Sequence, residues 1–140
     1  MRYLMMVKAT KEYEAGIPPS PAMMARMGKF MEERTKAGVL LAAEGLQPSS
    51  KGARLRYAGG KVMVTDGPFA ETKELIGGYA IVQANSHAEA VELARRFVQV
   101  HIEAGIQEVE MEIRPLSYPG SPGCTPAEPP QGVFGATSVQ

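Results

Sequence analysis

Apolar and polar residues follow two different periods along the chain, and these periods predict the order of its elements. Residues 3–7 (YLMMV) are apolar at consecutive positions, which is typical of a central strand covered on both faces. Ser20 followed by Pro21 forms an N-cap with proline at the first helical position, which predicts a helix over 21–37, ended by Gly38. The apolar stripe of this helix consists of Met23, Met24, Met27, Phe30 and Met31. It is interpreted either as an adaptable binding surface or as part of a flexible core, and the core is preferred.

The middle of the chain is predicted to form short strands. Residues 39–43 are apolar and form the next strand. The runs 53–58 and 61–65 are joined by a glycine pair, Gly59-Gly60, which predicts a hairpin. A second pair, Gly77-Gly78, is predicted to introduce a strand over residues 79 to 84.

A second helix and a last strand complete the pattern. The sequence Ser86-His87-Ala88-Glu89 has the spacing of a capping box. The inner face of the helix that follows holds six residues: Ala90, Leu93, Ala94, Phe97, Val98 and His101. Residues 108–114 alternate strictly, with Val109, Met111 and Ile113 on one side and glutamates and an arginine on the other. The glutamates on the second side, Glu108, Glu110 and Glu112, either line a space between two subunits of an oligomer or face water. The second interpretation is preferred because burying like charges is costly.

This order predicts an α+β fold. With the hairpin treated as an insertion, the elements read βαββαβ, the ferredoxin-like plait with both helices on one face of an antiparallel sheet. The second face then needs a cover, which another copy of the chain would supply. Residues 1–116 form the predicted domain, and the Pro/Gly/Ser-rich residues 117–140 form a tail that is predicted to be extended or disordered.

Composition excludes several classes of function. Fifteen basic residues balance fifteen acidic ones, so no net field favours nucleic acid or a membrane surface. One cysteine, Cys124, and two histidines make a dedicated metal site improbable on composition. No apolar run approaches the roughly 20 residues of a membrane span, and the N-terminus predicts a strand rather than a signal peptide, so a cytoplasmic location is expected. Neither glycine pair has the spacing of a phosphate-binding loop, and no cofactor is predicted.

Several motifs together resemble a known family. The stretches "AGVLLAAEGLQPSSKGARLRYAGGKVMVTDGPFAETKELIGGY" and "VEMEIRPL" resemble the DGPF group of YCII-related proteins, over about residues 1–116. The motifs appear in the family's order: Glu44-Gly45-Leu46, Asp66-Gly67-Pro68-Phe69, Glu71-Thr72-Lys73-Glu74 and Ile113-Arg114-Pro115. The resemblance implies a ferredoxin-like dimeric α+β barrel, a fold shared with cofactor-free isomerases, lyases and monooxygenases. It implies no particular reaction.

The chain departs from the catalytic pattern of related enzymes. YCII-related proteins similar to a dehydrochlorinase carry a histidine on the first helix and an aspartate in an Asp-Pro at the end of the second. Here the predicted helix over 21–37 holds no histidine, and residues 95–101 (RRFVQVH) hold no Asp-Pro. That pair is therefore not carried over.

Two other residues are candidate catalytic groups. Asp66 lies beside Gly67 and Pro68, where its carboxylate either points into a cavity as a base or anchor, or folds back on its own loop in an Asx turn. His101 continues an apolar helix face and could exchange protons near neutral pH, or could simply be a satisfied histidine at a helix C-terminus.

Five residues are candidate substrate-binding groups, each with a structural alternative. Glu44 enters the cavity or caps a loop, and Lys73 holds an anionic group or belongs to a solvated charge run. Arg54 and Arg56 share one face of the hairpin, where they bind a carboxylate or keep an edge soluble. Tyr79 offers a ring and a hydroxyl to a pocket or belongs to the core.

Two hypotheses of function follow. In the first, the protein is a cofactor-free isomerase or lyase, in which Asp66 or His101 moves a proton on a small organic acid or lactone. In the second, it is a non-enzymatic ligand-binding or accessory module. Because relatives of the resembled family occur beside alternative sigma factors, that module would serve regulation. The expected partners are a second copy of the chain and a small organic ligand.

Overall fold

The computed structural model describes residues 1–117, and its regular elements follow the predicted order. They are β1 (Arg2–Lys8), α1 (Lys11–Glu14), α2 (Pro21–Lys36), β2 (Leu40–Gly45), η1 (Ser49–Lys51), β3 (Ala53–Ala58), β4 (Lys61–Asp66), η2 (Thr72–Glu74), β5 (Ile76–Gln83), α3 (His87–Glu103) and β6 (Met111–Pro115). The predicted tail beyond Ser117, including Cys124, lies outside the described residues.

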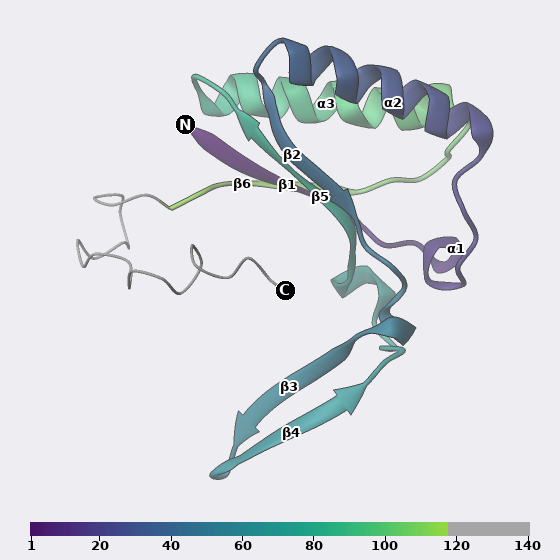
Figure 1. Cartoon of the computed structure of the whole chain (residues 1–140), viewed down its shortest axis with the longest axis vertical. Helices are drawn as coiled ribbons and strands as arrows, with labels where there is room; N and C mark the ends of the chain where they lie inside the picture. The colour runs from purple at the N-terminus through teal and green to yellow at the C-terminus, as the bar shows by residue number, and fades with distance from the viewer. Residues whose placement is uncertain (118–140) are drawn as a thin grey trace.

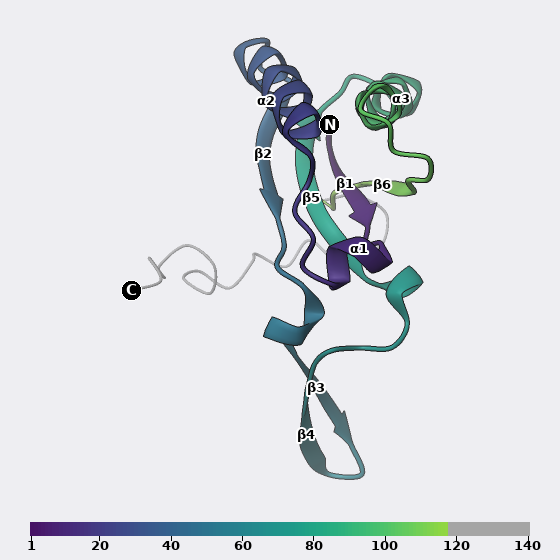
Figure 2. The ribbon, with the colours of Figure 1, turned by 90° about the vertical axis from the view of Figure 1, so that its right-hand side faces the viewer.

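Four strands form one antiparallel sheet in the order β2-β5-β1-β6. β1 lies between β5 and β6, which confirms the central position predicted for residues 3–7. The two long helices, α2 and α3, lie side by side over one face of this sheet (Figure 2). The prediction of an α+β fold with βαββαβ order and an inserted hairpin is therefore confirmed.

The helix boundaries follow from their caps. Ser20 Oγ accepts a hydrogen bond from the amide of Met23 (3.1 Å) at the start of α2, and Gly38 after its end adopts a left-handed φ of 74°. At the start of α3, Ser86 accepts from the amide of Glu89 (3.1 Å). The Glu89 carboxylate accepts from the amide of Asn85 (3.3 Å), one residue before the position that a capping box predicts.

The core lies between the helices and the sheet. Its buried residues come from β1, β2, β5 and α3, together with the alanine after β5: Tyr3, Met5, Leu40, Ala80, Val82, Ala84, Ala90, Leu93, Ala94 and Phe97. Phe30 of α2 packs edge-on against Phe97 of α3, with ring centroids 5.5 Å apart, and so joins the two helices. On α3, Val100 is buried and Val98 only half-buried, which corrects the predicted inner face by two positions.

The second face of the sheet is not covered by any helix of residues 1–117. Alternation places Leu4 and Met6 of β1 and Ile81 of β5 on this open face, half-buried among their strand neighbours. The two-sided cover predicted for residues 3–7 is therefore not supplied by the described part of the chain.

The last strand is shorter than predicted but alternates as predicted. β6 begins at Met111 rather than at residue 108, and Met111 and Ile113 pack against the core. Glu112 points to the open face, where it lies 3.9 Å from Lys8 Nζ and 3.8 Å from Arg114. Among Glu108, Glu110 and Glu112, it is therefore Glu112 that lies close to cationic side chains, those of Lys8 and Arg114.

β5 begins earlier than predicted, so that Gly77 and Gly78 lie inside the strand. A side chain at Gly78 would place its Cβ 3.1 Å from the carbonyl oxygen of Glu44, and one at Gly77 would touch the ring of Tyr13 at 3.5 Å. The pair therefore lies within the strand rather than before it, and allows close approach of β2 and of the segment before α2.

The inserted hairpin, residues 53–66, extends away from the sheet and is called the arm (Figure 1). Gly59 and Gly60 join β3 to β4 with φ of 60° and 77°, as a two-residue hairpin turn requires. The predicted hairpin is confirmed. Within residues 1–117, no helix has the length and apolarity that crossing a bilayer requires.

Candidate ligand-binding cavity

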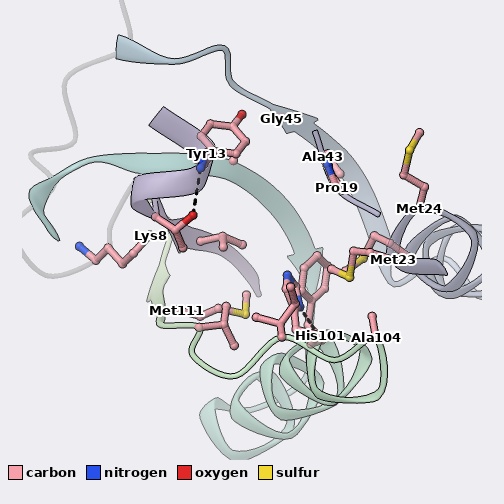
Figure 3. A pocket seen from close by; sticks show the side chains of 18 of the residues that line it. Lys8, Tyr13, Pro19, Met23, Met24, Ala43, Gly45, His101, Ala104 and Met111 are labelled. Atoms are coloured by element: carbon pink, nitrogen blue, oxygen red, sulfur yellow. Dashed lines mark hydrogen bonds between the residues drawn. The ribbon is translucent and has the colours of Figure 1, made fainter. Parts of the chain in front are cut away.

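A cavity of about 740 Å³ lies between the sheet and the two long helices. Its floor is formed by β1, β2 and β5, its roof by α2 and α3, and its ends by the segments before α2 and after α3 (Figure 3). This volume is within the usual range for sites that bind small organic molecules.

Methionine side chains dominate the lining. Six of the nine methionines of the chain line the cavity: Met5, Met23, Met24, Met27, Met31 and Met111. Met27 and Met31 also pack against the core, whereas Met24 is exposed at the cavity edge. The predicted methionine stripe therefore belongs both to the core and to the cavity wall, where flexible thioethers can adapt to a bound molecule.

His101 reaches the cavity from the last turns of α3 (Figure 3). Its Nδ1 lies 2.9 Å from the carbonyl oxygen of Phe97. Because a carbonyl only accepts, Nδ1 carries the proton in the neutral imidazole, and Nε2 is left as an acceptor. The imidazole also packs against the Phe97 ring, with centroids 5.8 Å apart, which fixes its orientation.

Tyr13 lies at the other end of the cavity, beside β2 (Figure 3). Its segment is held in place by Thr10, whose hydroxyl accepts from the Tyr13 amide at 3.1 Å. Burial raises the pKa of the Tyr13 hydroxyl above its ordinary value of 10.0, the nearby Glu14 adds to this effect, and a hydrogen bond with the Leu46 backbone opposes it.

Charged residues occur only at the edge of the cavity lining. Glu12 and Glu108 are exposed, and Lys8 lies 3.9 Å from Glu112 on the open face. Glu44 pairs with Tyr79, and since Tyr79 neighbours the core residue Ala80, alternation directs both side chains to the open face. Glu44 and Tyr79, two of the predicted substrate-binding residues, therefore border the cavity with their backbone, while their side chains point away from it.

The remaining predicted site residues lie away from the cavity. Asp66 ends β4, paired with Ala53, and is exposed. Lys73 is exposed in η2, and Arg56 is exposed on the arm. Arg54 places its guanidinium 4.0 Å from the centroid of the Phe69 ring. The structure does not bring Asp66 and His101 of one chain to a shared pocket.

The Asp-Gly-Pro-Phe motif forms a junction between the arm and the domain. A Cβ on Gly67 would lie 1.8 Å from the carbonyl oxygen of Ser49, so no larger residue fits there. The Phe69 amide donates to Ser49 Oγ at 3.0 Å, and Ser49 in turn donates its hydroxyl to Glu14 and its amide to the same carboxylate at 2.9 Å.

The Asx turn that was one alternative for Asp66 has no free amide donor. Pro68, two residues on, has no N–H, and the Phe69 amide donates to Ser49 Oγ. Phe69 lies against the Arg54 guanidinium and is not among the buried core residues.

Sequence reasoning missed Tyr13 and the contact between Glu14 and Ser49. The signal available was Thr10, a capping residue three positions before Tyr13, which marks the one-turn helix α1. Its contact with Ser49 is 35 residues distant in sequence, and no local pattern reports it. Among residues 1–117, no three potential ligands lie close enough to hold a metal ion.

An α+β domain with βαββαβ order and an apolar cavity between its helices and its four-stranded antiparallel sheet defines the class of this protein. The YCII-related domain family matches residues 1–113, and the chain belongs to this family. It is also similar to an uncharacterized protein of Rhizobium meliloti (strain 1021), with 33% identity over 95 residues, which cover 68% of this chain and 73% of that protein.

Proposed function

We propose that the protein binds a small, neutral and mostly apolar organic molecule in the cavity between the sheet and the helices, and that His101 exchanges a proton with it. The observation that carries this proposal is His101 itself, a side chain that lines a methionine-rich cavity and has Nε2 left as an acceptor. Lactones and phenols have the required size and polarity.

The charges around the cavity favour a neutral ligand over an organic acid. An anion would need a cation to replace its hydration, and desolvation without one is costly. Lys8 is the cation of the lining, and it is 3.9 Å from Glu112. Glu12 and Glu108 at the edge would further repel an anion.

In the reaction that we propose, His101 Nε2 accepts a proton from a carbon or hydroxyl of the ligand and returns it at a neighbouring atom. Such a transfer is an isomerisation, and it becomes an elimination where a leaving group departs instead. Asp66 has no part in this step, since it lies outside the cavity of its own chain.

A thermal-shift screen tests the proposal. Alkyl lactones and phenols are compared with carboxylic acids of matched size, on the wild-type chain and on His101→Ala. We expect neutral compounds to raise the melting temperature and carboxylates to have little effect, and we expect His101→Ala to weaken binding of the phenols about tenfold, as the loss of one hydrogen bond of about 1.4 kcal/mol implies.

His87→Ala is the matched control, because His87 lies on the same helix but is exposed at its start. If His87→Ala and His101→Ala have equal effects, or if only carboxylates bind, the proposal is wrong. If a bound compound is recovered unchanged after long incubation, the non-enzymatic ligand-binding alternative is favoured.

We also propose that two copies pair through their open sheet faces as a dimeric α+β barrel. The supporting observation is that Leu4, Met6 and Ile81 lie on a face that no other described element covers. Leu4→Glu is therefore expected to convert a dimer to a monomer in sedimentation experiments, and an unchanged mass would contradict this pairing.

A further inference from the structure

The arm has two chemically different faces. The register pairs Leu55 with Val64 and Tyr57 with Val62, and alternation places all four on one side. These side chains are between 62% and 74% exposed. A cluster of large apolar side chains this exposed is unusual on a monomer and marks an interaction surface.

The opposite face is basic. Arg54, Arg56 and Lys61 lie on it, together with Met63. Contacts with the domain are at the base of the arm, where the Gly67 amide donates to Gly52 (3.0 Å) and Arg54 lies over Phe69. Within residues 1–117, no element of the domain covers the apolar face.

Stability gives a reason for this face to be covered. A two-stranded hairpin is at best marginally stable alone in water, and it needs a further strand or a packing partner. The arm pairs β3 with β4 alone, as a sheet separate from the main one. Its Leu, Tyr and Val side chains would provide the missing stability if they were buried.

We propose that the arm packs its apolar face on a second copy of this chain, and that two copies exchange arms about a twofold axis. The arm is inserted between β2 and β5, which are hydrogen-bonded neighbours in the sheet that carries the open face.

The area of the interface also favours exchanged arms. Four strands of about six residues give a sheet face of roughly 400 Å², about half of the 800 Å² that each partner of a stable dimer buries. One face of the arm has an area of about 200 Å². In a twofold dimer each copy buries this area twice, once on its own arm and once on the surface that receives the partner's arm. Asp66, on the apolar side of the arm, would then face the second copy.

Neighbouring residues on opposite faces of the arm provide the test. Val64→Glu puts a carboxylate on the apolar face and Met63→Glu puts one on the basic face, at positions of similar exposure (63% and 53%). Dimer dissociation of the full chain is measured by sedimentation over a dilution series. We expect Val64→Glu to raise the Kd at least about a hundredfold, tenfold for each of two arms, and Met63→Glu to change it less than about threefold.

Hydrogen exchange on the wild-type chain gives a second measurement that needs no variant. We expect amides of residues 53–66 to exchange slowly in the dimer and faster as the sample is diluted. Equal effects of the two variants, equally fast exchange at all concentrations, or a wild-type monomer throughout would overturn the proposal. If Leu4→Glu dissociates the dimer and Val64→Glu does not, the copies pair through their sheets and do not exchange arms.

Discussion

The junction beneath the arm and the cavity beneath the helices are built in opposite ways. At the junction, Gly67 approaches the Ser49 backbone so closely that no side chain fits, and Ser49 is bonded to both Glu14 and Phe69. The cavity is lined by flexible methionines, and His101 supplies its imidazole. The junction requires particular residues, whereas the cavity requires only side chains of suitable size and polarity.

This difference separates the recognisable motif from the candidate chemistry. Asp-Gly-Pro-Phe is the motif that suggested the family resemblance, and backbone contact leaves no room for a side chain at its Gly67. The cavity carries no comparable signature, because methionines interchange with other apolar residues at small cost. The most recognisable residues of this chain therefore report on how the arm is attached.

The largest expected effect is that of Gly67→Ala. Since the added Cβ would lie 1.8 Å from the Ser49 carbonyl oxygen, the loop must move, and we expect a loss of about 3 kcal/mol in the free energy of unfolding. Urea denaturation measures it. Gly52→Ala is the control in the same junction, because its Cβ would lie at an ordinary 3.6 Å and should cost below about 1 kcal/mol. Equal losses would contradict the close approach.

Ser49→Ala is expected to have an intermediate effect. It removes the acceptor of the Phe69 amide and one donor to Glu14, both partly buried, at a cost of about 1 to 3 kcal/mol. The neighbouring Ser50 is exposed, so Ser50→Ala serves as the control in the same denaturation experiment. A Ser49→Ala chain as stable as the Ser50→Ala chain would show that the junction does not depend on this hydroxyl.

Tyr13, which lies between the two regions, is expected to have the smallest effect. Its pKa is raised on folding, chiefly by burial, so the stability that it contributes is fully present below pH 10.0 and is lost as the pH rises through the folded value. Tyr13→Phe removes this loss. Melting temperatures at pH 8 and pH 11 should therefore differ more for the wild type than for the variant, and identical differences would contradict the assignment.

The sequence predicted most of the fold because its signals are local. Ser20 and Ser86 cap the helices that they were expected to cap, and Gly59-Gly60 forms the expected turn. The Gly77-Gly78 pair was placed before its strand but lies inside it, since glycines that admit a neighbouring backbone look the same in sequence as glycines that precede a strand.

The candidate site was only partly predictable. His101 was identified from helical spacing alone and lies in the cavity. Asp66 was selected for its motif, but tertiary contacts between Ser49 and the loop after Asp66 decide how that motif is used. Tyr13 was missed because its position depends on residues that are distant in sequence.

Methionine methyl resonances provide the most direct test that the cavity is the ligand site. With ¹³C-methyl methionine in the full chain, a neutral alkyl lactone is titrated while all nine methyl signals are followed. We predict shifts at the six cavity methionines and none at Met1, Met6 and Met63, which lie at the N-terminus, on the open face and on the arm. Shifts at Met6 or Met63 with unchanged cavity signals would contradict the account.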